Sequence, residues 1–239
     1  MQARSFPDLQ APPEDVLFDR DGVTWNCCMY FKGICFISDR KYSDLPFYDM
    51  IHDVLRAGVR CIQYREKDLS RREIYENAVT LRKLTGLFDA TLIVNDHADI
   101  ALAVDADGVH LGQDDLPLKV ARKIMGKKIV GISTHTLAQA KEAELGGADY
   151  IGFGPVFHTT TKDAGAPKGA DHIRVIKESL SIPVVAIGGI GLDNIASVIS
   201  AGADAVAVAT AICRGDITAN AEKFVRFFKN NYSLTRSRR

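Results

Sequence analysis

Short apolar runs alternate with amphipathic segments along most of the chain. From Gly33 onward, each apolar run stops at polar residues, and the segment that follows has apolar positions at helical spacing. This pattern predicts a succession of eight strand–helix units. The predicted strands span residues 33–38, 59–65, 91–95, 108–111, 128–133, 150–153, 183–187 and 205–208.

The segments between these runs carry the end signals of helices. Ser70 with Glu73 fits a capping box, Pro117 lies where a first turn tolerates proline, and Gly58 and Gly146 are placed to end helices. The predicted helices span residues 47–57, 70–85, 100–104, 116–125, 137–145, 170–179, 194–200 and 217–230.

Eight strand–helix units are the number that closes a parallel barrel, and strict alternation without paired hairpins favours a parallel sheet. The expected fold class is therefore α/β, a TIM (β/α)8 barrel formed by residues 33–230 as a single catalytic domain. A doubly wound open sheet is the alternative, although no G-x-G-x-x-G pattern opens the first helix. Residues 1–32 are expected to be an N-terminal extension, and residues 231–239 a basic C-terminal tail.

Composition narrows the function classes. The 239 residues carry 30 basic and 30 acidic side chains, so net charge gives no case for nucleic acid or an anionic membrane as partner. No apolar run reaches the roughly 20 residues that span a bilayer, and the N-terminus lacks the apolar segment of a secretory signal. The five cysteines lack C-x-x-C spacing, which favours buried free thiols. We expect a soluble cytoplasmic protein, and the sequence is compatible with a homo-oligomer.

Two consecutive predicted strands end in carboxylates. Asp96 follows the strand that ends at Asn95, and Asp114 and Asp115 follow the next one. Because the carboxyl ends of parallel strands meet at one end of a barrel, these acids are expected side by side, where hard oxygen ligands suit Mg²⁺. The alternative is that they only cap the helices that follow.

The second strand ends in the run Gln63-Tyr64-Arg65-Glu66-Lys67. Alternation sends Gln63, Arg65 and Lys67 to one face, and Tyr64 shares the other face with Ile62. An amide and two cations converging on the barrel mouth suit a polyanion such as a diphosphate. The alternative is a solvated charge run, in which an inward Arg65 would need a buried acid as partner, and nearby Asp96 or Asp115 is expected to supply it.

Three further strand ends offer hydroxyls, a cation and small residues. Ser133 ends the fifth strand, where its hydroxyl could touch substrate or cap a helix. The loop after the sixth strand holds Thr159, Thr161 and Lys162, which suit an oxyanion, although its length also fits a mobile lid. The last two strands end in glycines and in Ala209-Thr210, where this kind of barrel usually cradles a phosphate. The histidines form no recognisable metal triad and are interpreted as ordinary core or surface residues.

Seven motifs, taken in order, are similar to those of thiamine-phosphate synthase, a TIM-barrel family. The resemblance spans about Gly33 to Lys229. The motifs are QYREK (63–67), NDHADIA (95–101), ADGVHLGQDD (106–115), GISTHT (131–136), GPVFHTTTK (154–162), AIGGI (186–190) and GADAVAVATAI (202–212).

The resemblance implies a transferase of thiamine biosynthesis. It would join 4-amino-2-methyl-5-(diphosphooxymethyl)pyrimidine to thiazole phosphate, 4-methyl-5-(2-phosphooxyethyl)thiazole. Mg²⁺-assisted loss of pyrophosphate would precede attack by the thiazole nitrogen. The family's motif favours Asp115 over Asp114, so Asp96 and Asp115 become the expected magnesium ligands. The expected contacts to the pyrimidine diphosphate are Gln63, Arg65, Lys67, Asn95, Ser133 and Lys162, of which Arg65, Lys67, Ser133 and Lys162 are the expected catalytic residues. Thr159, Thr161, Gly189, Ala209 and Thr210 are the expected thiazole-phosphate site.

Two departures and two rival functions accompany this interpretation. Ala209-Thr210 stands where the family more often has a larger apolar residue and serine, and the N-terminal extension is longer than usual.

The related thiazole tautomerase shares the barrel, but it carries histidine where this chain has Pro155. A non-catalytic phosphate-binding barrel is the rival of a different class, and it would leave the carboxylate pair without a purpose.

Overall fold

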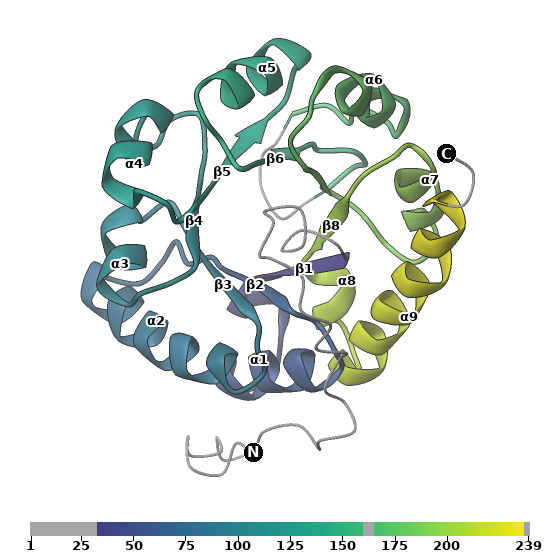
Figure 1. Ribbon diagram of the computed structural model, residues 1–239. Coiled ribbons are helices and arrows are strands. Elements are labelled where there is room, and N and C mark those ends of the chain that lie inside the picture. Colours follow the sequence, from purple (N-terminus) through teal and green to yellow (C-terminus); the bar gives the residue numbers. More distant parts are fainter. Residues whose placement is uncertain (1–32, 160–164, 237–239) are drawn as a thin grey trace.

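The computed structural model describes residues 33–159 and 165–236. Eight parallel strands close into a barrel in which each strand pairs with its neighbours in chain order, and β1 pairs with β8 (Figure 1). The predicted TIM-type α/β barrel is therefore confirmed, and the open-sheet alternative is wrong. The strands are β1 Gly33–Ser38, β2 Cys61–Tyr64, β3 Thr91–Asn95, β4 Gly108–Leu111, β5 Ile129–Thr134, β6 Tyr150–Phe153, β7 Val184–Ile187 and β8 Ala205–Val208.

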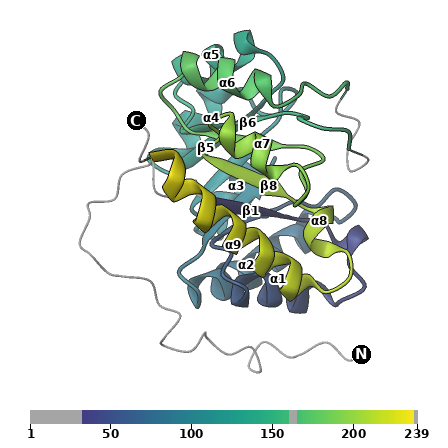
Figure 2. The same ribbon diagram turned by 90° about the vertical axis from the view of Figure 1, so that its right-hand side faces the viewer.

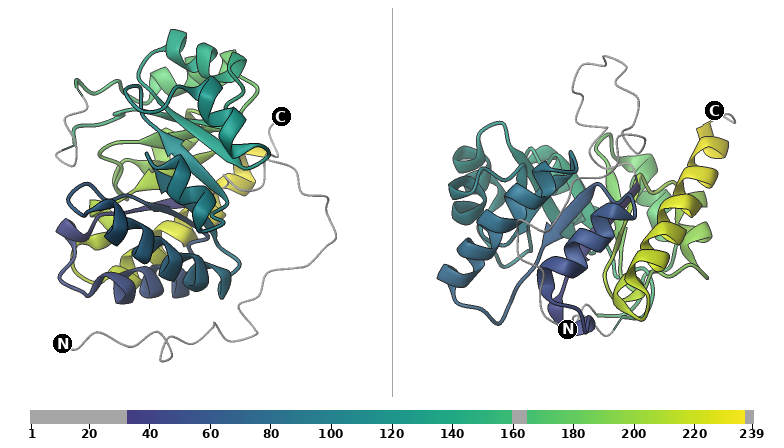
Figure 3. Two further views of the ribbon diagram at one scale, coloured as in Figure 1. Left: turned by 90° about the vertical axis from the view of Figure 1, so that its left-hand side faces the viewer. Right: turned by 90° about the horizontal axis from the view of Figure 1, so that it is seen from below.

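Helices surround the barrel, and α9 lies between α7 and α1, where it completes the ring (Figures 1 and 2). Figure 3 shows the barrel from two further directions, with helices along its outside. None of the helices within the described ranges is long and apolar enough to cross a membrane. The helices are α1 Phe47–Arg56, α2 Arg71–Gly86, α3 Ala98–Ala103, α4 Leu118–Met125, α5 Leu137–Leu145, α6 Asp171–Ser179, α7 Ile195–Ser200, α8 Thr210–Cys213 and α9 Ile217–Arg236, with the short 3-10 helix η4 at Arg40–Tyr42.

The predicted elements agree with the structure except at some ends. The capping box is present, because the Ser70 side chain accepts from Glu73 N–H while the Glu73 carboxylate accepts from Ser70 N–H. The prediction missed η4 and α8, which are too short to show an apolar period. It also ended the last helix at Asn230, whereas α9 runs to Arg236. The N-terminal extension, residues 1–32, lies outside the described residues.

Apolar side chains form two layers, one on each side of the strands. The outer layer packs the strands against the helices and contains the larger part of the core. The inner layer fills the barrel with small and medium side chains, including Cys35, Cys61, Ile93 and Ala207 around the ring of Tyr150. Alternation along each strand produces this division, since successive residues face opposite sides.

Glycine makes room for the largest inward side chain. A Cβ atom on Gly131 would lie 2.1 Å from the Tyr150 ring, and one on Gly152 would lie 3.1 Å from the His110 ring. Both distances are closer than ordinary van der Waals contact. The tyrosine and the histidine therefore occupy the barrel interior only because two neighbouring strands carry glycine there.

An aspartate immediately before β4, β6 and β8 joins each of these strands to the one before it. One oxygen of each carboxylate accepts from a backbone N–H near the start of the preceding strand and from a cation on the helix that leads into that preceding strand (α2, α4 or α6). The sequence shows the recurrence as Ala-Asp at 106–107, 148–149 and 203–204. The three sets are Asp107 with Leu92 and Arg82, Asp149 with Val130 and Arg122, and Asp204 with Val184 and Lys177.

We expect Asp204→Ala to lower the free energy of unfolding by about 2 kcal/mol, because the N–H of buried Val184 and the Lys177 ammonium both lose their carboxylate partner. Urea denaturation measures the change. The matched control is Glu142→Ala on the exposed side of α5, which should change stability by about 0.5 kcal/mol or less. Equal effects of the two substitutions would contradict a structural role for the Asp204 bridge.

Candidate active site

A cavity of 360 Å³ opens at the carboxyl ends of the strands, and residues at or after all eight strands line it. Its size falls in the range of small-molecule sites, which starts at about 300 Å³. Every predicted site residue that the structure describes lies in its wall. These residues are Gln63, Arg65, Lys67, Asn95, Asp96, Asp115, Ser133, Thr159, Gly189, Ala209 and Thr210. Thr161 and Lys162 lie outside the described residues.

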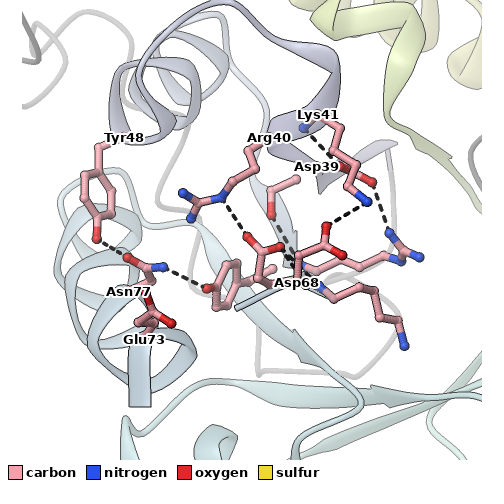
Figure 4. A network of polar contacts seen from close by, with 12 residues as sticks. Asp39, Arg40, Lys41, Tyr48, Asp68, Glu73 and Asn77 are labelled. Atoms are coloured by element: carbon pink, nitrogen blue, oxygen red, sulfur yellow. Dashed lines mark hydrogen bonds and ion pairs between the residues drawn. The ribbon is translucent and has the colours of Figure 1, made fainter. Parts of the chain in front are cut away.

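The side chains at the end of β2 face opposite sides, as strand alternation predicted. Gln63, Arg65 and Lys67 line the cavity, whereas Tyr64 faces the helices and its hydroxyl accepts from Asn77 Nδ2 at 3.2 Å. Tyr48 on α1 donates to the same Asn77 side chain at 2.6 Å, as Figure 4 shows. Burial raises the pKa of Tyr64 to about 12. Gln63, Arg65 and Lys67 therefore face the cavity, whereas Tyr64 faces the helices.

Arg65 has a carboxylate partner that the sequence interpretation did not name. Its guanidinium donates to Asp39 Oδ2 at 3.0 Å, and both side chains are largely buried, at 18% and 10% exposure. The acid expected for an inward arginine was sought in Asp96 or Asp115, and that expectation is wrong for the arrangement seen here. Asp39 directly follows β1, so the rule applied to the other strand ends would have found it.

The Asp39–Arg65 pair is the innermost of three ion pairs between the loops after β1 and β2 (Figure 4). Arg40 pairs with Glu66 at 2.7 Å, and Lys41 pairs with Asp68 at 2.7 Å on the surface. Each pair joins opposite charges from the two loops, so the loops attract each other. This arrangement holds Arg65 against the cavity wall.

The two predicted metal ligands lie together. Asp96 lies at φ 66°, a left-handed conformation that aspartate tolerates better than most residues, and its N–H donates to the His110 carbonyl at 2.8 Å. Burial raises the pKa of Asp115, and the adjacent Asp96 carboxyl adds to this effect, while the Gly112 N–H that donates to Asp115 at 2.6 Å opposes it. The two carboxyl groups therefore interact across the rim of the cavity.

The helix-cap alternative for these acids is wrong. The residue at the start of α3 is His97 and that at the start of α4 is Pro117, and neither helix has a side-chain cap. Instead, Asp96 accepts from Lys67 Nζ at 2.5 Å. Within residues 33–159 and 165–236, no group of three or more His, Cys, Asp or Glu side chains is arranged to hold a metal ion. The protein thus offers a carboxylate pair beside a cation.

His110 is a site residue that the sequence interpretation set aside. It lines the cavity and is 7% exposed, with Nε2 at 2.9 Å from Ser133 Oγ and Nδ1 at 2.8 Å from the Tyr150 hydroxyl. Gln113 Nε2 donates to the Ser133 carbonyl at 2.6 Å. The signal was available, because His110 has the inward parity of β4, with Val109 and Leu111 on the opposite face.

The glycines after β7 satisfy a packing requirement as well as lining the cavity. A Cβ atom on Gly188 would lie 2.7 Å from Pro155, and one on Gly189 would lie 2.2 Å from the His158 carbonyl. The loop after β6 passes here, and Val156 N–H donates to the Ile187 carbonyl at 2.9 Å. Both glycines have positive φ. The described part of this loop is therefore fastened to the end of β7.

These groups suit an anionic substrate whose leaving group carries a large negative charge. Arg65 and Lys67 provide cations at one side of the cavity, and Ser133 provides a hydroxyl nearby. Glycines and other small residues at the ends of β7 and β8 line another part of the wall. The carboxylate pair between Lys67 and Gly112 is a donor set for a hard divalent cation.

Comparison with known proteins agrees with this geometry. Residues 34–212 match the family described as thiamine monophosphate synthase. The thiamine-phosphate synthase of Chloroflexus aurantiacus is 51% identical over 176 residues, which cover 73% of this chain and 82% of that protein. That of Halalkalibacterium halodurans is 47% identical over 184 residues, covering 76% of this chain and 87% of that protein.

A solved structure extends the agreement to three dimensions. The thiamine phosphate pyrophosphorylase of Pyrococcus furiosus superposes with a TM-score of 0.80 at 40% identity, covering 86% of this chain and 98% of that one. The match to the family includes all eight strands except the first residue of β1. The chain therefore belongs to the thiamine monophosphate synthase family and is a transferase of thiamine biosynthesis.

Proposed function

We propose that the protein joins 4-amino-2-methyl-5-(diphosphooxymethyl)pyrimidine to the thiazole phosphate and releases thiamine phosphate and pyrophosphate, with Mg²⁺ as cofactor. The observation that carries the proposal is the arrangement at one rim of the cavity, where the pair Asp96 and Asp115 lies beside Lys67. A diphosphate with a divalent cation needs both signs of charge within one site. The identity of the two substrates is inferred from membership of the family.

The donor set fits Mg²⁺. This ion is commonly held by one or two carboxylates together with substrate phosphates and water, so two protein ligands are enough. Asp96 and Asp115 would hold it, because both carboxyl groups lie at one rim of the cavity, where burial and then the Asp96 carboxyl raise the pKa of Asp115. When bound, Mg²⁺ would neutralise part of the charge that develops on the departing pyrophosphate.

Arg65 and Lys67 are proposed to grip the diphosphate from its other side. The fork of an arginine matches phosphate oxygens, and a lysine adds a compact positive charge. Asn95 and Ser133 would contact the pyrimidine substrate from the ends of β3 and β5, where both line the cavity. Lys162, outside the described residues, is proposed to add a third cation.

The thiazole phosphate is proposed to bind at the ends of β6, β7 and β8. Thr159, Gly189, Ala209 and Thr210 line that part of the cavity, and Thr161 would join them. Ala209 and Thr210 differ from the residues most common in the family. Contacts made by backbone N–H groups would tolerate this difference, since they depend on the chain path and not on the side chain.

The reaction we propose breaks the bond between the pyrimidine methylene carbon and the diphosphate oxygen. The bonding electrons leave with pyrophosphate, and the pyrimidine-methyl cation that remains is captured by the lone pair of the thiazole nitrogen. The charge of the leaving group grows during the first step. Fixed cations beside that oxygen would therefore stabilise the transition state more than the ground state.

We expect the purified protein, given both substrates and Mg²⁺, to form thiamine phosphate and an equal amount of pyrophosphate, and EDTA to stop the reaction. Chromatography and a coupled pyrophosphate assay measure the two products. Folded protein that yields neither would contradict the proposal. Conversion of a thiazole tautomer alone would favour the tautomerase, and binding of both phosphates without turnover would favour a binding protein.

We expect Asp96→Asn to lower kcat by about 100-fold at limiting Mg²⁺, a loss of about 2.7 kcal/mol of transition-state stabilisation, because one of two charged ligands becomes neutral. Excess Mg²⁺ should recover part of the loss. Asp99→Asn is the matched control, since Asp99 lies three residues later on the same loop-helix segment and pairs with Arg71 outside the cavity. Unchanged activity of Asp96→Asn at limiting Mg²⁺ would refute the carboxylate-pair assignment.

We expect Asp39→Asn to lower kcat/KM for the pyrimidine diphosphate by about tenfold, because Arg65 loses the charge that holds its guanidinium, while one oxygen remains to accept from Lys41 N–H. Steady-state kinetics with the thiazole phosphate saturating measure the effect. The control is Asp68→Asn in the exposed outer pair with Lys41, because a solvent-screened surface ion pair contributes little. Equal kcat/KM in the two variants would show that Asp39 does not position Arg65.

A further inference from the structure

A line of hydrogen bonds crosses the barrel interior beneath the cavity. It runs from Gln63 on β2 to the Tyr150 hydroxyl on β6, then to His110 on β4, and ends at the hydroxyl of Ser133 on β5. The Tyr150–His110 contact measures 2.8 Å and the His110–Ser133 contact 2.9 Å. Ser133 and His110 line the cavity, whereas Tyr150 lies below it. Tyr150 therefore reaches the site only through its neighbours.

Burial makes the direction of each hydrogen bond matter. Tyr150 is 2% exposed, His110 is 7% exposed and Gln63 is 5% exposed. A buried polar group that points its proton the wrong way loses a hydrogen bond and keeps its desolvation cost, about 1–3 kcal/mol. The rings also have little freedom to turn, because the Tyr150 ring fills the space over Gly131 and the His110 ring lies against Gly152.

The phenol can donate one hydrogen bond and accept others, and a neutral imidazole donates from one nitrogen and accepts at the other. Burial raises the pKa of Tyr150 well above its ordinary value, so the phenol keeps its proton. The Gln63 side chain acts in the opposite sense and lowers that pKa. The Gln63 amide can donate to the phenol oxygen, and the phenolic proton then suits the imidazole nitrogen 2.8 Å away.

The opposite polarity fits the same contacts less well. It would bring an Nδ1–H as a further donor to the phenol oxygen and turn the phenolic proton away from a nearby acceptor. It would also make Ser133 donate its only proton to His110 Nε2. The hydroxyl would then face an anionic substrate with lone pairs alone, which an anion repels.

We propose that Tyr150 is a positioning residue that donates to His110 Nδ1 and so holds the imidazole as the Nε2–H tautomer. His110 then donates to Ser133 Oγ, and the serine hydroxyl turns its own proton into the cavity. Gln113 fixes the serine backbone from the other side through the Ser133 carbonyl. Ser133 thereby becomes a directed donor to an oxygen of the anionic substrate. The role of Ser133 toward an anionic substrate, and the part of the polarity argument that uses this substrate, rest on the proposed function.

The tautomer can be measured in the substrate-free protein. Protein labelled with ¹⁵N-histidine gives long-range ¹H–¹⁵N correlation spectra that distinguish the Nε2–H form, the Nδ1–H form and the imidazolium. His110→Gln identifies the His110 signals among the six histidines. We expect the Nε2–H form in the unaltered protein, and a shift toward the Nδ1–H form in Tyr150→Phe, which removes only the hydroxyl. An Nδ1–H form or an imidazolium in the unaltered protein would overturn the proposal.

Two control variants separate this role from a general effect on folding. Tyr64→Phe also removes a buried tyrosine hydroxyl, but that hydroxyl bonds Asn77 on the helix side of β2, so the His110 signals should not change. Ser133→Ala removes the partner at Nε2 and should leave His110 in the Nε2–H form, since Tyr150 remains. A tautomer that changes in Ser133→Ala and not in Tyr150→Phe would assign control to the serine and refute the proposal.

The kinetic readout is a fall in kcat of about tenfold in Tyr150→Phe, the size expected for one misdirected hydrogen bond, with little change in KM or in the Mg²⁺ requirement. Tyr64→Phe should stay within about twofold of the unaltered protein. An unchanged kcat in Tyr150→Phe, with the tautomer shifted, would show that the serine proton plays no part in turnover. If the unaltered protein makes no thiamine phosphate, the proposed function fails, whereas the tautomer measurement still decides the role of Tyr150.

Discussion

The geometry of the cavity depends on strand register, and the register is held at the opposite end of the barrel. A one-residue slip of any strand would exchange its inward and outward side chains, which would turn the polar groups of that strand away from the cavity. The aspartates before β4, β6 and β8 each accept from a backbone N–H of the preceding strand. Each also accepts from a cation on the helix that leads into that preceding strand. Three joints of the barrel are thereby fixed by charge as well as by apolar packing.

The inner layer shows how a polar group can be kept inside such a barrel. Most of its side chains are small or aliphatic, and they surround one tyrosine whose hydroxyl reaches upward to His110. The polar line then continues to the floor of the cavity. The Tyr150 ring thus packs in the apolar inner layer, while its hydroxyl takes part in the polar line. The tyrosine therefore transmits the rigidity of the core to the hydroxyl of Ser133.

The sequence predicted those features that follow from strand periodicity alone. The positions of the strands, the inward parity of Gln63, Arg65 and Lys67, and the meeting of Asp96 with Asp115 all depend on one rule, that polar residues at strand ends gather at one rim. The same rule could have found Asp39 and His110. Asp39 was passed over because a single acid after β1 resembles a turn residue, and His110 because histidine is common in cores.

Other features depend on the three-dimensional path of the chain, which periodicity does not predict. The pairing of Arg65 with Asp39 instead of Asp96 depends on the path of the loop after β1, which includes the short η4. The need for glycine at 188 and 189 comes from a loop that passes over them, and periodicity does not describe loops. Tyr150 looked like an ordinary aromatic strand residue. Only the closure of the barrel places its hydroxyl beside His110.

The contact between Tyr150 and Gly131 also has a consequence for how this barrel can change over generations. With a tyrosine at 150, any side chain at 131 would place its Cβ atom 2.1 Å from the ring, so the glycine has no tolerated replacement. With a smaller residue at 150, position 131 becomes free to vary, but a return to tyrosine is then blocked as soon as 131 acquires a side chain. The order of substitution is therefore constrained, and these two positions on neighbouring strands are inherited as one unit.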